Sequence, residues 1–178
     1  MHRFPPLPYN RAYLSCKRGQ RTYCSGLYLS DHDNSLFYLN KALDINLKRF
    51  GEYDVNTAMF YNSIGAIYTS MKEYDEALEY FKKALNIREN IFGKVHDDVA
   101  NSYGNIGMIY HYLGDDNKCL EYHLMSLDIR RQIFGDNSPH IALASMNIAQ
   151  DYINLNDNNN ALKYFHNALD IAEKCFDD

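Results

Sequence analysis

The side chains best suited to catalysis or metal binding are scattered along this 178-residue chain. Its seven histidines, at positions 2, 32, 96, 111, 123, 140 and 166, lack the short paired spacing of a zinc site. The four cysteines include no CxxC pair, so reduced thiols are a better interpretation than a disulfide framework. No GxSxG, Walker, HExxH or GxGxxG motif is present. The sequence therefore predicts no catalytic residue, no metal site and no cofactor, and an intrinsic enzyme is the least favoured alternative.

Two local clusters of polar residues resemble sites but have simpler interpretations. Residues 154–160 are rich in Asn, with Asp157 among them, yet they lack the central Gly and the distal Glu of a calcium-binding loop. His111 and Asp115 flank a turn rather than converge on one point. We expect ordinary polar turns in both places.

Composition and charge exclude several classes of protein. With 46% apolar and 23% charged residues, the chain falls in the range of soluble globular proteins. Residues 31–178 carry 13 basic and 23 acidic side chains, and an acidic surface is poorly suited to nucleic acid. No segment approaches the roughly 20 consecutive apolar residues of a membrane helix. We expect a cytoplasmic protein that binds neither nucleic acid nor membrane.

Residues 1–30 form a basic leader with five Lys or Arg side chains and no acidic one. The leader is rich in Pro and Tyr, poor in Ser, and shows no clear amphipathic face, which favours a poorly ordered segment over a mitochondrial presequence. A short helix over residues 20–29, through Leu27 and Leu29, is a further alternative.

Internal repetition is the strongest signal in the sequence. The pair Phe50-Gly51 recurs at intervals of 42 residues as Phe92-Gly93 and Phe134-Gly135. The motif Ala-Leu-x-Ile before it and the motif Ile-Gly with a following Tyr keep the same register. Three columns in one register indicate true repeats of one structural unit.

Each period contains two apolar runs with the i, i+3/i+4 spacing of an amphipathic helix. We expect helix A at about 54–70, 97–112 and 138–154, and helix B at about 32–49, 74–91, 116–133 and 158–175. The Gly of each Phe-Gly pair closes helix B, because Gly readily adopts the left-handed conformation. Asp54 and Ser138 are good N-caps, with Pro139 in the first turn, and Asp97 could cap the middle helix A in place of His96.

The repeats define the expected domain organisation. After the leader (1–30) we expect a repeat array over 31–178, made of a partial repeat at 31–51 and full repeats at 52–93, 94–135 and 136–178. A single helix pair cannot bury its apolar stripe, so neighbouring pairs must stack into an all-α solenoid of antiparallel helices.

The order of small and aromatic residues on the two helices resembles the tetratricopeptide repeat. The 42-residue period, the Ala-Leu-x-Ile motif and the Phe-Gly stop are most similar to the repeats of kinesin light chains. This resemblance implies a right-handed superhelix whose inner wall is lined by helix A and which binds a protein or peptide.

The resemblance also assigns packing roles inside each repeat. Small residues on helix A (Gly65, Gly107, Ala149) are expected to face small residues on helix B (Ala77, Cys119, Ala161). Cys119 is then a buried small hydrophobe rather than a reactive thiol. His123 occupies the column of Phe81 and Phe165, and we expect a partly exposed helix histidine, with a ligand or pH-sensing role as the alternative.

The turn between helix A and helix B departs from the family pattern. Gly114 matches the usual glycine, but Lys72 and Asn156 replace it in the other two repeats.

A partner-binding groove is predicted on the helix A segments, which contain no Lys or Arg. Its expected residues are Met59, Asn62, Ser63, Asn101, Asn105, Met108, His111, Met146, Asn147, Gln150 and Ile153. Related repeats place asparagine in the column of Ser63, Asn105 and Asn147 to hold a peptide backbone, and the alternative is that these amides only bond neighbouring helices. Without cations, the groove is not expected to favour an acidic peptide.

The favoured function is a non-enzymatic protein-protein interaction module that binds a peptide or partner helix in this groove. The alternative is an accessory or assembly segment of a larger motor, signalling or enzyme protein, with no ligand of its own. The last helix B offers Leu162, Phe165, Leu169 and Ile171 without a following helix to cover them, which predicts self-association through the C-terminal helix or a longer array.

Overall fold

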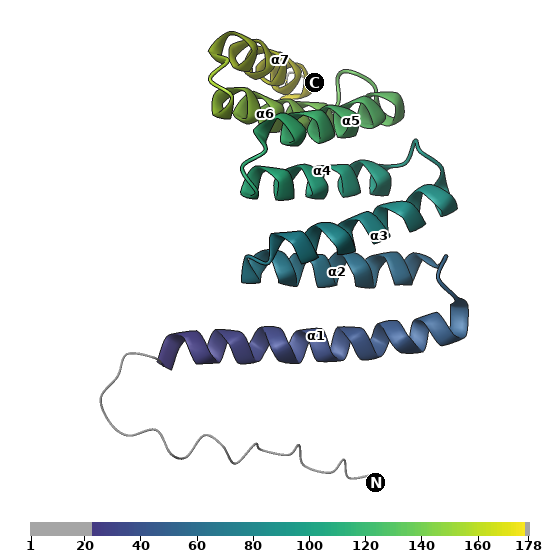
Figure 1. Cartoon of the computed structure of the whole chain (residues 1–178). Helices are drawn as coiled ribbons and strands as arrows, with labels where there is room; N and C mark the ends of the chain where they lie inside the picture. Colours follow the sequence, from purple (N-terminus) through teal and green to yellow (C-terminus); the bar gives the residue numbers. More distant parts are fainter. Residues whose placement is uncertain (1–22, 177–178) are drawn as a thin grey trace.

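The computed structural model describes residues 23–176, which form seven α-helices (Figure 1). All the elements in this part of the chain are helical, as the apolar periodicity predicts. Their bounds are α1 Tyr23–Phe50, α2 Val55–Met71, α3 Tyr74–Phe92, α4 Asp97–Tyr112, α5 Asp116–Phe134, α6 Pro139–Asn154 and α7 Asn158–Phe176. The six helices after α1 begin and end within two residues of the expected positions.

Helix α1 is longer than the sequence pattern indicates. It begins at Tyr23 rather than near residue 32, and it continues without a break to Phe50. The segment contains no Pro, and Gly26 is its one residue of poor helix propensity, so nothing in the backbone stops the helix. Residues 1–22, which make up most of the predicted leader, lie outside the described part of the chain.

The helices stack in chain order as antiparallel pairs, α2 with α3, α4 with α5 and α6 with α7, while α1 packs on α2 (Figure 1). Apolar clusters fill the spaces between successive pairs: Ala77, Phe81, Ile106 and Ile109 form one, and Leu127, Ile141, Ile148 and Ile171 belong to the next. The chain therefore has no single central core, and the predicted all-α repeat solenoid is confirmed.

The helix caps agree only in part with the expectations. Asp54 caps α2 by accepting a 3.0 Å hydrogen bond from the backbone N–H of Asn56. His96, not Asp97, caps α4, because its Nδ1 accepts a 3.1 Å bond from the N–H of Asp98. Ser138 occupies the N-cap position of α6, but its buried hydroxyl has no hydrogen-bond partner among residues 23–176.

The three turns between paired helices share one backbone conformation despite their different residues. Gly114 has φ of 82°, and Lys72 and Asn156 have φ of 64° and 60°. The left-handed conformation crowds the Cβ of any residue except Gly, so Lys72 and Asn156 hold this turn at an energetic cost.

Helix A and helix B approach closely at the predicted glycines, and the nearest atoms include an aromatic ring in addition to, at Gly107, the expected Cys119. A Cβ on Gly65 would lie 3.1 Å from the ring of Phe81, and Ala77 is not among its nearest neighbours. A Cβ on Gly107 would lie 2.8 Å from the His123 ring and 3.1 Å from the Cys119 carbonyl oxygen. The glycines therefore make room for the ring one turn further along helix B.

Candidate partner-binding surface

The eleven predicted groove residues lie on α2, α4 and α6. Nine of them are exposed, and Asn62 and Asn105 are half-buried. The three helices contact each other along this side: the Asn105 amide donates a 2.9 Å hydrogen bond to the Asn62 side-chain oxygen, and the Asn154 amide lies 3.4 Å from Nδ1 of His111. We call this face, made by the eleven residues, the helix A surface.

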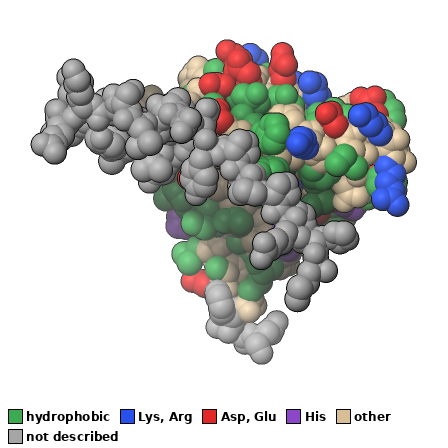
Figure 2. Space-filling model, turned by 90° about the horizontal axis from the view of Figure 1, so that it is seen from below, with side chains coloured by type: hydrophobic (Ala, Val, Ile, Leu, Met, Phe, Trp, Pro, Cys, Tyr) green, Lys and Arg blue, Asp and Glu red, His purple; other side chains and the backbone are tan. Residues whose placement is uncertain are grey.

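Large apolar side chains stand out of the helix A surface. Met59 is 55% exposed and Met146 is 51% exposed, and Met108, Leu143 and Ile153 are exposed as well. Methionine side chains are flexible and polarizable, which suits contact with partners of varied shape. Figure 2 shows the molecule from below, where hydrophobic side chains are interspersed with acidic and basic ones.

The predicted amide column does not act as one unit. Ser63 donates a 2.9 Å hydrogen bond to the carbonyl oxygen of Met59 in its own helix. Asn105 is bonded to Asn62, as the alternative interpretation of a structural amide requires. Within the described residues, Asn147 makes no side-chain hydrogen bond and is exposed. Asn147 is therefore the member of the column whose amide is available to a ligand.

A cation that sequence reasoning missed reaches this surface from helix B. Arg130 of α5 donates a 2.6 Å hydrogen bond to Asn101, and its Nε lies 3.5 Å from the Asp97 carboxylate. It lines a small pocket together with Gly104, His123, Ser126, Ala144 and Asn147. Arg88, one period earlier, donates a 2.7 Å hydrogen bond to the Ser102 hydroxyl. An Ile-Arg pair that recurs after 42 residues was therefore the sequence signal that could have indicated an arginine at this position.

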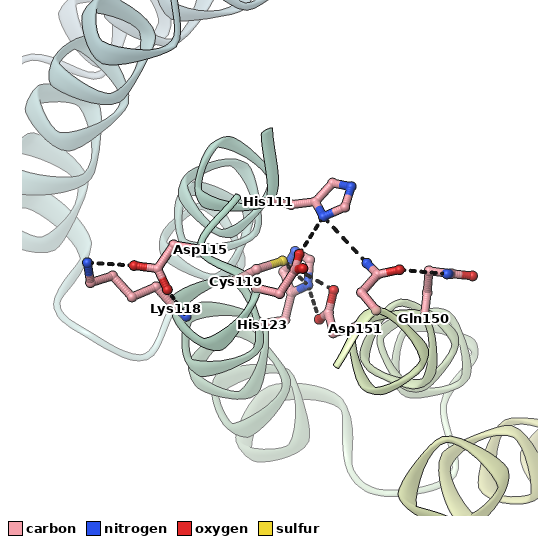
Figure 3. Close-up of polar contacts among 9 residues, drawn as sticks. His111, Asp115, Lys118, Cys119, His123, Gln150 and Asp151 are labelled. Carbon is pink, nitrogen blue, oxygen red and sulfur yellow. Dashed lines mark hydrogen bonds and ion pairs between the residues drawn. The ribbon is translucent and has the colours of Figure 1, made fainter. Parts of the chain in front are cut away.

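Three polar side chains, two of them buried and one half-buried, meet between α5 and α6, and we call Cys119, His123 and Asp151 the polar trio (Figure 3). Asp151 accepts a 3.2 Å hydrogen bond from the Cys119 thiol, and His123 Nδ1 lies 2.6 Å from its other oxygen. Burial, followed by the Asp151 contact, raises the pKa of the Cys119 thiol well above its usual range. Cys119 is buried as predicted.

His123 is partly exposed as expected, with 16% of its side chain accessible, and the structure adds a partner, Asp151, whose side chain is 5% accessible. Histidine spacing alone could not reveal this cluster, since Asp151 follows His123 by 28 residues and lies on another helix.

Comparison with known proteins identifies the repeat. The model of the tetratricopeptide repeat matches residues 27–90, 56–131 and 98–174. The chain belongs to the tetratricopeptide repeat family. This confirms the resemblance drawn from the repeat columns.

Solved structures with the same fold include kinesin light chain-like proteins. BtubC (BKLC) from P. vanneervenii superposes with a TM-score of 0.75 at 21% identity, covering 89% of this chain and 67% of that one. A putative kinesin light chain from P. anserina with nearly identical TPR-like repeats gives 0.70 at 12% identity, covering 91% and 81%. The apo form of RapI gives 0.69 at 26% identity, covering 85% and 53%. No curated protein sequence gives a significant match to the chain.

Membership in this family makes the chain a protein-protein interaction module of a typically non-enzymatic kind. Among the described residues, none of the helices combines the length and the hydrophobicity needed to cross a bilayer.

Proposed function

We propose that this protein binds a segment of a partner protein along the helix A surface. The observation that carries the proposal is the set of exposed apolar side chains on the three helix A segments α2, α4 and α6, among them Met59, Met108 and Met146. Covering apolar area yields about 25 cal/mol per Å², so a few such side chains supply much of the affinity of a peptide complex. The Asn147 amide can both donate to and accept from the backbone of the bound segment.

The charges around the surface indicate an apolar or neutral segment rather than an acidic one. Helices α2, α4 and α6 carry no Lys or Arg, and Arg130 is already paired with Asp97 and bonded to Asn101. An acidic terminal peptide would bring carboxylates without an unpaired cation to meet them. Apolar side chains spaced to match the exposed methionines are the complementary chemistry.

Affinity capture from a lysate of the source organism, read by mass spectrometry, tests the proposal. The baits are the native chain, the double variant Met108→Glu/Met146→Glu, and Met125→Glu. Met125 is a matched control because it is 40% exposed on α5. We expect one set of proteins to be captured by the native chain and the control and lost with the double variant. Identical sets with all three baits would refute the surface and favour a spacing or assembly role.

Single substitutions can distinguish the roles of the Asn105 and Asn147 amides once a partner has been identified. Asn147→Ala should weaken binding by about 1–3 kcal/mol and leave stability unchanged, since its amide has no bond within the described protein to lose. Asn105→Ala should lower stability, because it breaks the bond to Asn62. Unchanged affinity in Asn147→Ala would exclude the amide from recognition.

A second candidate function is self-association through α7. Leu162, Phe165 and Leu169 are 58%, 38% and 54% exposed, whereas Phe81 and Leu127 at corresponding positions of α3 and α5 are buried under the next helix. Ile171, which we expected in this exposed face, is instead buried in the cluster with Leu127 and Ile141. A second copy could cover the α7 face as α4 and α6 cover α3 and α5. Sedimentation velocity should show a dimer that Phe165→Glu dissociates, and a native monomer at high micromolar concentration would refute it.

A further inference from the structure

The polar trio occupies a packing position that is apolar in the repeat before it. One period of 42 residues earlier, Cys119, His123 and Asp151 correspond to Ala77, Phe81 and Ile109. Those three residues are buried together between α3 and α4 in an apolar cluster. All three columns change at the same helix junction, and the new side chains face one another.

The changes replace an apolar contact by three groups that are costly to bury. A carboxylate removed from water requires a partner for nearly every lone pair, and well-packed apolar residues are often as stable. In the preceding repeat, Ala77, Phe81 and Ile109 fill the corresponding position of the same fold. Stability of the solenoid therefore does not explain why Cys, His and Asp stand here.

The donor atoms are already close to the arrangement that a tetrahedral metal ion requires. Cys119 Sγ lies 3.7 Å from His123 Nδ1 and 3.2 Å from Asp151 Oδ1, and His123 Nδ1 lies 2.6 Å from Asp151 Oδ2. Bond lengths of 2.0–2.3 Å at the tetrahedral angle place zinc ligands about 3.4–3.6 Å apart. One donor atom from each of the three side chains can be chosen so that all three atoms lie within 4.8 Å of one another, and small side-chain movements would bring them to this spacing.

We propose that the polar trio is a zinc-binding site, in which Cys119, His123 and Asp151 supply three ligands that join α5 to α6. The thiolate and imidazole donors select Zn²⁺ over Mg²⁺ or Ca²⁺, which prefer oxygen ligands alone. Cys119 and His123 are four residues apart, so they stand on one face of α5, and Asp151 reaches them from α6.

The surroundings of the site allow an ion to enter and one further ligand to bind. His123 lines the small pocket that also contains Gly104 and Asn147 of the helix A surface. Gly107 leaves space for the imidazole ring, whose Nε2 would lie 3.0 Å from a Cβ at that position. Three protein ligands leave the fourth tetrahedral position to an external donor. This site does not depend on the proposed partner binding.

Titration of the full-length protein with Zn²⁺ and Co²⁺ tests the proposal. The background carries Cys16→Ser, Cys24→Ser and Cys175→Ser, so that Cys119 is the sole thiol. We expect one ion per chain and the absorption spectrum of tetrahedral Co²⁺ with a thiolate charge-transfer band. A hundredfold excess of Zn²⁺ over its Kd should raise the melting temperature by roughly 5–10 °C.

The matched control is the triple variant Cys119→Ala/His123→Phe/Asp151→Ile, which installs the residues of the preceding repeat. It should keep the helical circular dichroism spectrum and bind Zn²⁺ at least a hundredfold more weakly. The proposal is overturned if this variant binds Zn²⁺ as tightly as its parent, or if bound Co²⁺ lacks the thiolate band. It is equally overturned if neither ion binds, which would make the trio a hydrogen-bonded core contact.

Discussion

Replacing His123 alone should destabilise the metal-free protein more than replacing the whole polar trio. In His123→Phe the Asp151 carboxylate, 5% accessible, keeps only the Cys119 thiol as a partner. Breaking a buried carboxylate pair on one side costs about 3–5 kcal/mol, because the remaining charge stays buried. Asp151→Ile alone leaves the imidazole N–H unpaired, at a cost of about 1–3 kcal/mol.

The triple variant removes all three polar groups at once and restores a packing that exists between α3 and α4. Replacing a buried polar network by apolar residues of fitting shape is often neutral or stabilising by about 1–4 kcal/mol. A Phe ring at position 123 would pack against Gly107, as the ring of Phe81 packs against Gly65. We therefore expect the triple variant to be at least as stable as the native chain.

Urea denaturation followed by circular dichroism, with a chelator present, measures these free energies of unfolding. The decisive quantity is the difference between the triple variant and the sum of the three single variants, which should exceed about 3 kcal/mol in favour of the triple. Additive effects would refute the reasoning, because they would mean that the three side chains act independently.

The remaining predictions concern backbone positions and are read by the same denaturation assay. Lys72→Gly should stabilise the protein by about 0.5–1 kcal/mol, since φ of 64° strains any side chain, whereas Lys72→Ala keeps a Cβ at this φ and should not stabilise it. Equal effects would exclude backbone strain at Lys72. Gly107→Ala should cost about 1–3 kcal/mol, because the new Cβ would lie 2.8 Å from the ring of His123. The control is Gly104→Ala in the same helix, whose new Cβ would meet nothing within 4 Å and which should stabilise the protein by about 0.5–1 kcal/mol. An unchanged free energy of unfolding in Gly107→Ala would contradict the close packing of Gly107 against His123.

Helix positions and the repeat family could be read from the sequence because they depend on local periodicity repeated several times. The Phe-Gly stop and the apolar stripe place α2 to α7 within two residues. The start of α1 was expected near residue 32, with a separate short helix over residues 20–29 only as an alternative, since that segment has no second copy of its pattern and no Pro to mark a helix end. The sequence left His96 and Asp97 both open as the N-cap of α4, because Asp is the commoner N-cap and only backbone geometry shows which side chain accepts the bond.

The sequence by itself determined a stack of helix pairs whose helix A segments carry no Lys or Arg, since a 42-residue period and residue types along one helix are properties of the chain alone. Only the tertiary structure decided which side chains meet across helices. Arg130 reaches Asn101 from 29 residues away, and Asp151 reaches His123 from 28. Stacking sets such contacts through the separation and rotation of whole helices, and a single sequence does not specify these quantities residue by residue.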